Sequence, residues 1–124
     1  MKKTVTYVAN EEKRIVTARG TRCEFDALKE IAKVHMPGMK VNQIPNYERY
    51  MIKDTFTSTA KCHPDDVFNE RKGQMVAEGK MMHNYSRAKA KAIRRYANDM
   101  AKMAKMADKV ATRYAIKAHV ADDI

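Results

Sequence analysis

SRAKAKAIRRYANDMAKMAKMADKVATRYAIKAHV, residues 86–120, is the stretch of the chain that most clearly predicts a single regular element. Alanine, methionine, lysine and arginine dominate it, and these residue types favour the α-helix. Its apolar side chains recur at alternating intervals of three and four residues, which is typical of a helix–helix seam. The seam runs over three heptads and consists of Ile93, Tyr96, Met100, Met103, Ala107, Val110 and Tyr114.

A seam of this length needs a second apolar surface to cover it. One interpretation is that another copy of the chain supplies the same helix, so that the protein is a homo-oligomer, a dimer or higher. The alternative is that a helix over residues 68–83 and the sheet of the same subunit cover the seam. We expect the homo-oligomer, because few other residues of the chain are in regular structure.

The start of the chain predicts a β-hairpin. Residues 4–8 and 14–18 are rich in β-branched and aromatic side chains, and the polar turn at residues 10–13 separates them. This arrangement is typical of two antiparallel strands, with Gly20 ending the second.

A short helix is predicted next. Thr21, followed three residues later by Glu24, matches a capping box. The helix would run to His35, where Pro37 and Gly38 stop it.

The middle of the chain is read as a loop and then a strand. Residues 39–50 predict a loop, and residues 50–62 hold enough β-forming side chains for one long strand. Pro64 ends this strand because proline cannot donate to a ladder. A helix over residues 68–83, capped by Asp66 or Asn69, would follow, with a break at residues 84–86 before the long helix.

These elements predict an α+β fold in a single domain, residues 1–124. A small N-terminal antiparallel β-sheet with one short helix occupies residues 1–67. Long C-terminal α-helices that mediate oligomerisation occupy residues 68–120.

The composition indicates an anionic partner in a reducing compartment. The 124 residues carry a formal net charge of +10, which favours binding to phosphates, nucleic acid or acidic surfaces. The two cysteines, Cys23 and Cys62, match no disulfide framework and predict reduced thiols. We also expect no membrane span and no signal peptide, because no apolar run is long enough. We therefore expect the protein in the cytoplasm.

The positive charge is concentrated in the long helix. Residues 86–117 hold ten basic residues and two acidic ones, which gives 10 − 2 = +8 of the total. A solvated helix face usually mixes its signs, so this excess favours a phosphate ligand. Arginine matches a phosphate with two donors at once, and the sharper candidates are therefore Arg87, Arg94, Arg95 and Arg113.

Two shorter segments are further candidates for phosphate or base contacts. Thr21 and Arg22 follow Gly20 at the expected start of a helix, where free N–H groups bind anions; an ordinary helix cap explains them equally well. The corner at residues 59–69 brings together Lys61 and Phe68. Phe68 is either a core residue or an aromatic that stacks on a base.

Tyr85 and Tyr96 have the same two interpretations as Phe68, and the core is favoured for Tyr96 because it lies on the seam.

No signature of an enzyme is present: the chain lacks a P-loop, a nucleophile elbow and a zinc-protease motif. The histidines and cysteines lack metal-ligand spacing. We therefore expect a binding protein without cofactor or metal.

The corner sequence TAKCHPDDVF, residues 59–68, resembles small phage proteins of the Thoeris anti-defence sponge type. The resemblance implies an N-terminal sheet, long C-terminal helices, oligomers, and sequestration of cyclic nucleotide signals without cleavage, in the host cytoplasm. It implies that Phe68 stacks on a base and that Arg95 and Arg113 meet the phosphates of a cyclic ADP-ribose-like signal between subunits. It further implies a separate cyclic oligonucleotide site at Thr21 and Arg22.

Two other functions remain open from the sequence. The basic C-terminal helix would also suit a nucleic-acid-binding protein that lies along a phosphate backbone. A phage protein that inhibits an acidic host protein is the third interpretation.

Overall fold

The computed structural model describes residues 4–122, and it divides the chain into two compact units, Met1–Ile93 and Arg94–Ile124. The first unit contains the sheet, the short helices and the beginning of the long helix. The second unit is the remainder of that helix. Each unit is described by itself below.

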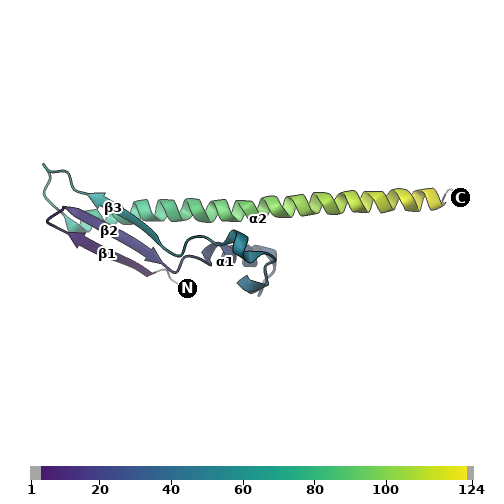
Figure 1. The fold of residues 1–124 in the computed structure, drawn as a ribbon, viewed down its shortest axis with the longest axis horizontal. Helices are drawn as coiled ribbons and strands as arrows, with labels where there is room; N and C mark the ends of the chain where they lie inside the picture. Colours follow the sequence, from purple (N-terminus) through teal and green to yellow (C-terminus); the bar gives the residue numbers. More distant parts are fainter. Residues whose placement is uncertain (1–3, 123–124) are drawn as a thin grey trace. The chain divides into compact units, whose positions relative to one another are not determined.

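An antiparallel sheet of three strands forms the first unit's framework: β1 (Thr4–Asn10), β2 (Ile15–Thr21) and β3 (Phe56–Lys61), in the order β1-β2-β3 (Figure 1). The predicted hairpin and antiparallel sheet are confirmed. Both hairpin strands are longer than predicted, and β2 continues through Gly20 because Gly20 pairs with Val5 and Phe56. The predicted strand at residues 50–62 is too long at its start.

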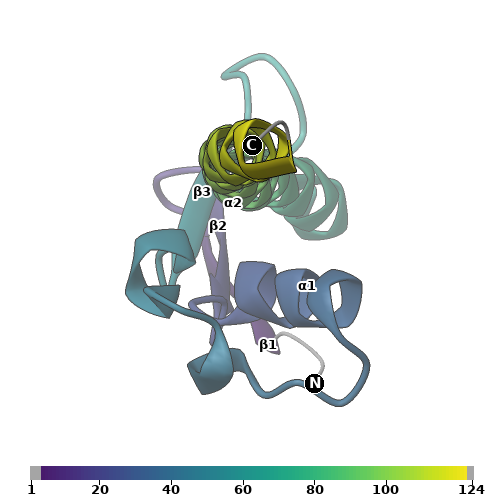
Figure 2. The same cartoon turned by 90° about the vertical axis from the view of Figure 1, so that its right-hand side faces the viewer.

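Helical turns occupy much of the segment between β2 and β3. Helix α1 (Asp26–His35) is followed by two 3₁₀-helices, η1 (Val41–Gln43) and η2 (Tyr47–Tyr50). They lie beyond one end of the sheet (Figures 1 and 2). The side chain of Tyr50 is buried, so this residue ends a helical turn in the core where a strand was predicted to begin.

The predicted capping box at Thr21 is wrong. Helix α1 begins at Asp26, and its N-cap residue, Phe25, makes no side-chain capping bond. Thr21 instead belongs to β2, where it pairs with Thr4. Arg22, which follows, has a left-handed backbone with φ of 60°. The sheet ladder therefore takes up the residue that a local motif would have used as a cap.

One helix, α2 (Glu70–Asp122), replaces the two helices that were predicted. Its cap is Asn69, whose side-chain oxygen accepts a hydrogen bond from the Lys72 amide at 3.1 Å. Asn69 is one of the two caps that the sequence predicted. No break occurs at residues 84–86. Tyr85 is buried there, and tertiary packing of this kind outweighs the weak helix propensity of the residues beside it.

Helix α2 covers one face of the sheet at very short range. Two residues of a strand advance about 6.7 Å, and four residues of a helix advance about 6 Å. Every second residue of the strand therefore lies opposite every fourth residue of the helix. The strand supplies Val16, Ala18 and Gly20, and the helix supplies Gly73, Ala77 and Met81. Figure 2 shows the strands and α2 end-on.

Tyr96, the first seam residue of the second unit, is buried at 9% exposure, as its core interpretation predicted. Every residue from 101 to 122 is exposed, including Met103 at 61% and Tyr114 at 62%. Residues 70–83 belong to the same helix as the seam, so they do not cover it as a separate helix, and that part of the alternative is wrong. Coverage by a second copy of the chain stays a prediction.

Candidate functional site

A pocket of about 250 Å³ lies at the corner where β3 leads into α2. We call it the corner pocket. It brings together two residues that the sequence singled out, Lys61 and Phe68, although Phe68 precedes the helix and Lys61 ends the strand. Phe68 is half-buried, so part of its ring remains available to a ligand. The other principal lining residues are Cys62, Asn69, Lys72 and Lys80.

The corner pocket carries net positive charge, because its lining includes three lysines and one aspartate, Asp66. Lys72 and Lys80 stand two turns apart on α2, and Lys61 borders the pocket from β3. Lys80 donates to the Thr59 carbonyl oxygen at 3.4 Å. Within residues 4–122, no carboxylate forms an ion pair with Lys61 or Lys72. An anionic group in the pocket would therefore meet ammonium groups that are not already neutralised.

Arg14 holds the corner in place from the hairpin turn. Its backbone is left-handed, with φ of 58°, and its guanidinium group donates to the carbonyl oxygens of His63 and Asp66 and to the sulfur of Cys62. The Cys62 amide in turn donates to the Arg14 carbonyl oxygen at 2.8 Å. These bonds fix the chain that carries Phe68, so the pocket is formed before any ligand binds.

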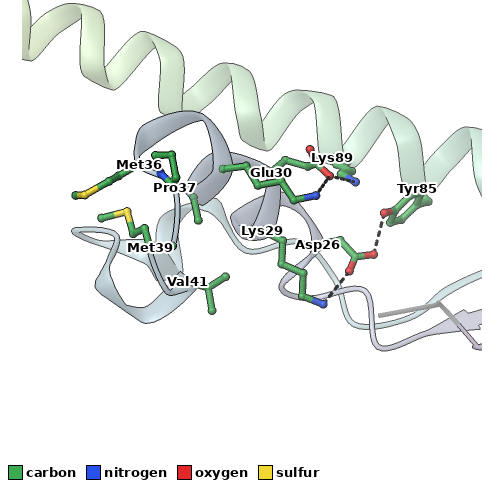
Figure 3. A pocket seen from close by; sticks show the side chains of 12 residues that line it. Asp26, Lys29, Glu30, Met36, Pro37, Met39, Val41, Tyr85 and Lys89 are labelled. Atoms are coloured by element: carbon green, nitrogen blue, oxygen red, sulfur yellow. Dashed lines mark hydrogen bonds and ion pairs between the residues drawn. The ribbon is translucent and has the colours of Figure 1, made fainter.

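A second cavity, of about 780 Å³, lies between α1, the following loop and α2 (Figure 3). The charged side chains that line this cavity already form ion pairs with one another or with neighbouring residues. Lys29 lies 3.7 Å from Asp26, and Glu30 lies 3.7 Å from both Lys33 and Lys89. Although this cavity is larger, its cations are engaged with carboxylates, so we regard the corner pocket as the better phosphate site.

Tyr85 borders the second cavity but is buried to 5% exposure. Its ring meets Phe56 edge-on, with centroids 5.7 Å apart, and its hydroxyl donates to an Asp26 carboxylate oxygen at 2.8 Å. Burial, and then the hydrogen bond and negative charge of Asp26, raise the pKa of Tyr85 far above its usual value. Of its two sequence interpretations, the structure therefore places Tyr85 in the core.

The candidate arginines of α2 are not among the described residues that line the two cavities. Arg87, Arg94 and Arg113 are exposed, and Arg95 is half-buried. Within the second unit the basic positions share one side of the helix, opposite the seam. We call this set the basic stripe: Arg94, Arg95, Lys102, Lys105, Lys109 and Arg113.

Thr21 and Arg22 do not form the anion site expected at a helix N-terminus, because α1 starts at Asp26. The Thr21 hydroxyl donates to the Thr4 carbonyl oxygen at 3.5 Å, and Arg22 is exposed. Sequence reasoning also missed Lys72 and Lys80. Their spacing of eight residues, with Val76 midway, places them on one face of a helix and was the available signal.

Across the described part of the chain, no three histidine, cysteine, aspartate or glutamate side chains are grouped as metal ligands. In the same part, no helix combines the length and the apolar character that crossing a bilayer requires. Comparison with protein-family models, with curated proteins and with solved structures gave no match to this chain.

Proposed function

We propose that this protein is a phage anti-defence sponge, which binds a cyclic nucleotide signal of the cyclic ADP-ribose type in the host cytoplasm and sequesters it without cleaving it. The observation that carries the proposal is that Lys61 and Phe68 border one pocket together with Lys72 and Lys80. The pocket thus pairs an aromatic face with unneutralised cations. These are the two groups that a base and a phosphate need.

The affinity would come from stacking and charge, and no bond of the ligand would be broken. Phe68 offers a partly open ring for the base. Lys72 is close to the capped N-terminus of α2, where the helix dipole also favours negative charge. The resemblance of residues 59–68 to the sponge family supports the same assignment.

A homo-oligomer would complete the site. The arginines of the basic stripe line neither of the two cavities in a single chain. As the resemblance to the sponge family implies, Arg95 and Arg113 of a further copy would contribute phosphate contacts in the oligomer. The apolar exposure of Met103 and Tyr114 supports oligomerisation.

Calorimetric titration with cyclic ADP-ribose isomers, followed by recovery of the ligand, tests this function. We expect saturable binding and recovery of intact ligand after the protein is denatured. Binding that is absent for every isomer, or a ligand recovered in cleaved form, would contradict the proposal. Arg95→Ala is expected to weaken binding while the circular dichroism spectrum stays unchanged.

A second candidate, nucleic-acid binding, is favoured by the like charges of the basic stripe. Lys105, Lys109 and Arg113 of the stripe follow one another at intervals of four residues, and Lys117, outside the stripe, continues the spacing. Like charges at this spacing destabilise a helix by about 0.2–0.5 kcal/mol per pair, and a polyanion laid along the helix would relieve that repulsion. A linear array of cations matches an extended phosphate backbone better than it matches one small ligand.

Salt dependence separates the two candidates. Binding of a duplex along the stripe would release many counterions, so that its affinity falls steeply as salt rises. A cyclic ADP-ribose isomer has few phosphates and would give a shallow slope. Lys105→Gln and Lys109→Gln should reduce the slope for a duplex by about one each.

A further inference from the structure

The face of the sheet opposite α2 consists mainly of threonine hydroxyls. Alternation along each strand places every second residue on this face, and the strand register aligns these residues in rows across the sheet. Thr6, Arg19 and Thr57 form one row, and Val8, Thr17 and Thr59 form the next. Thr4 and Thr21 pair beyond the Arg19 row. We call this surface the threonine face.

The threonine face is largely exposed in the described residues of the first unit, with only Thr17 and Thr21 half-buried. Thr6, Arg19, Thr57 and Thr59 are exposed, and Val8 is 67% exposed. The opposite face, by contrast, holds the buried Val16 and Ala18 under α2. Helix α2 therefore covers the apolar face of the sheet, whereas the face that carries the threonine hydroxyls is largely open to solvent.

The threonine face carries positive charge without negative charge. Arg19 stands at its centre, and Lys61 is at its border with the corner pocket. In the three strands as the structure describes them, this face includes no aspartate or glutamate. A cationic surface of this kind repels a second copy of itself, so it is not suited to stacking sheet on sheet in an oligomer.

We propose that the threonine face binds double-stranded DNA in the major groove, with Arg19 reading guanine. The backbones of the two outer strands lie about 10 Å apart, and the major groove is about 12 Å wide. The central strand β2 would point Arg19 at the base edges, where its fork matches the two acceptors of guanine. The outer strands would then place their hydroxyls near the flanking phosphates.

The threonines are suited to this role because each combines a donor with a methyl group. Thr6 and Thr57 lie directly across from Arg19 on the two neighbouring strands. Their hydroxyls can donate to phosphate oxygens or to bases, and their methyl groups can contact the thymine methyl. The high net charge of +10 would bring the protein to DNA at long range.

Fluorescence anisotropy of the full-length chain tests this proposal, using short duplexes of equal length that are either rich in guanine or built from adenine and thymine alone. We expect the parent to prefer the guanine-rich duplex. Arg19→Ala should weaken binding to it by about tenfold or more, and Arg19→Lys, which keeps the charge but loses the planar fork, should reduce the preference. Arg71→Ala, which removes one positive charge from the first turn of α2, is the matched control and should change affinity by less than about threefold.

A triple variant, Thr6→Val, Thr17→Val and Thr57→Val, keeps β-branched side chains on the strands while removing three hydroxyls. It should also weaken duplex binding, and its unchanged melting temperature would show that the sheet is intact. The proposal is overturned if no duplex binds at low salt, if Arg19→Ala and Arg71→Ala behave alike, or if polyglutamate competes as well as DNA. Titration of the Arg19 variants with cyclic ADP-ribose isomers keeps this inference separate from the sponge function, because those variants leave the corner pocket unaltered.

Discussion

Gly73 of α2 and Val16 of β2 lie so close that a Cβ atom at Gly73 would come within 2.5 Å of Val16 Cγ2. No real side chain tolerates such a distance, so glycine at this point is what lets the helix rest on the sheet. The same close approach carries the start of α2 past the end of β3. It therefore sets the dimensions of the corner pocket, in which both elements take part.

We expect Gly73→Ala to destabilise the fold by about 1–3 kcal/mol, because overpacking outweighs the helix propensity that alanine gains. Gly79→Ala is the matched control, since a Cβ there meets no atom within 4 Å. It should stabilise the helix by about 1 kcal/mol. Urea unfolding of both variants gives the two free energies, and equal effects would contradict the packing described here. Adding Val16→Ala to Gly73→Ala should recover part of the loss.

Tyr85→Phe should lower stability by about 1–3 kcal/mol at neutral pH, because the buried Asp26 carboxylate loses a hydrogen-bond donor. The pKa of Tyr85 is raised in the folded state. In the unfolded chain the hydroxyl has the usual tyrosine pKa of about 10 and loses its proton there. The stabilisation is thus complete below about pH 10 and declines above it. Melting temperatures of parent and variant should converge as the pH rises through this range. A gap that stays constant would show that Tyr85 ionises freely in the fold.

The seam predicts the oligomeric state. Met103→Glu together with Val110→Glu places charges on the exposed apolar side of the second unit, which should shift the protein toward single chains of 14.2 kDa in native mass spectrometry. Thr112→Glu adds a charge on the opposite side of the helix and should leave the assembly unchanged. A parent protein that is already a single chain at micromolar concentration would refute the seam as an interface.

Lys72 tests the electrostatic half of the proposed nucleotide site. Lys72→Gln keeps much of the side-chain length and removes a charge that no ion pair neutralises in the described residues. We expect cyclic nucleotide affinity to fall by about 10-fold to 150-fold, as for the loss of one charge-assisted hydrogen bond. Lys53→Gln, an exposed lysine outside the pocket, should have no measurable effect. Calorimetric titration of both variants distinguishes a specific contact from a general dependence on net charge.

The local sequence pattern correctly predicted the secondary structure of those elements whose residues follow one periodicity. The alternation around β1 and β2 predicted the hairpin, and the seam spacing predicted the helical end of the chain. The wrong predictions concern residues whose secondary structure is determined by tertiary contacts. Thr21 has the features of a helix cap but pairs in the sheet, and the expected break at residues 84–86 is absent because Tyr85 packs in the core.

The candidate site was predictable only in part for a related reason. Lys61 and Phe68 are close in sequence, so their pairing at one corner followed from the chain itself. Lys72 and Lys80 reach the pocket only because α2 turns back along the sheet, which sequence spacing alone did not establish. The threonine face likewise depends on the register between strands that are distant in sequence, as Arg19 and Thr57 are.

The central claim is that Phe68 and the lysines of the corner pocket bind one nucleotide ligand, and the affinity of Phe68→Ala for cyclic ADP-ribose isomers tests it most directly. Stacking of a base on an aromatic ring contributes about 1–3 kcal/mol, so the dissociation constant should rise by about 5-fold to 150-fold. Val34→Ala, which truncates a side chain of α1 that is 82% exposed and lies outside the corner pocket, should match the parent. If Phe68→Ala also binds with the affinity of the parent, the corner pocket is not the nucleotide site.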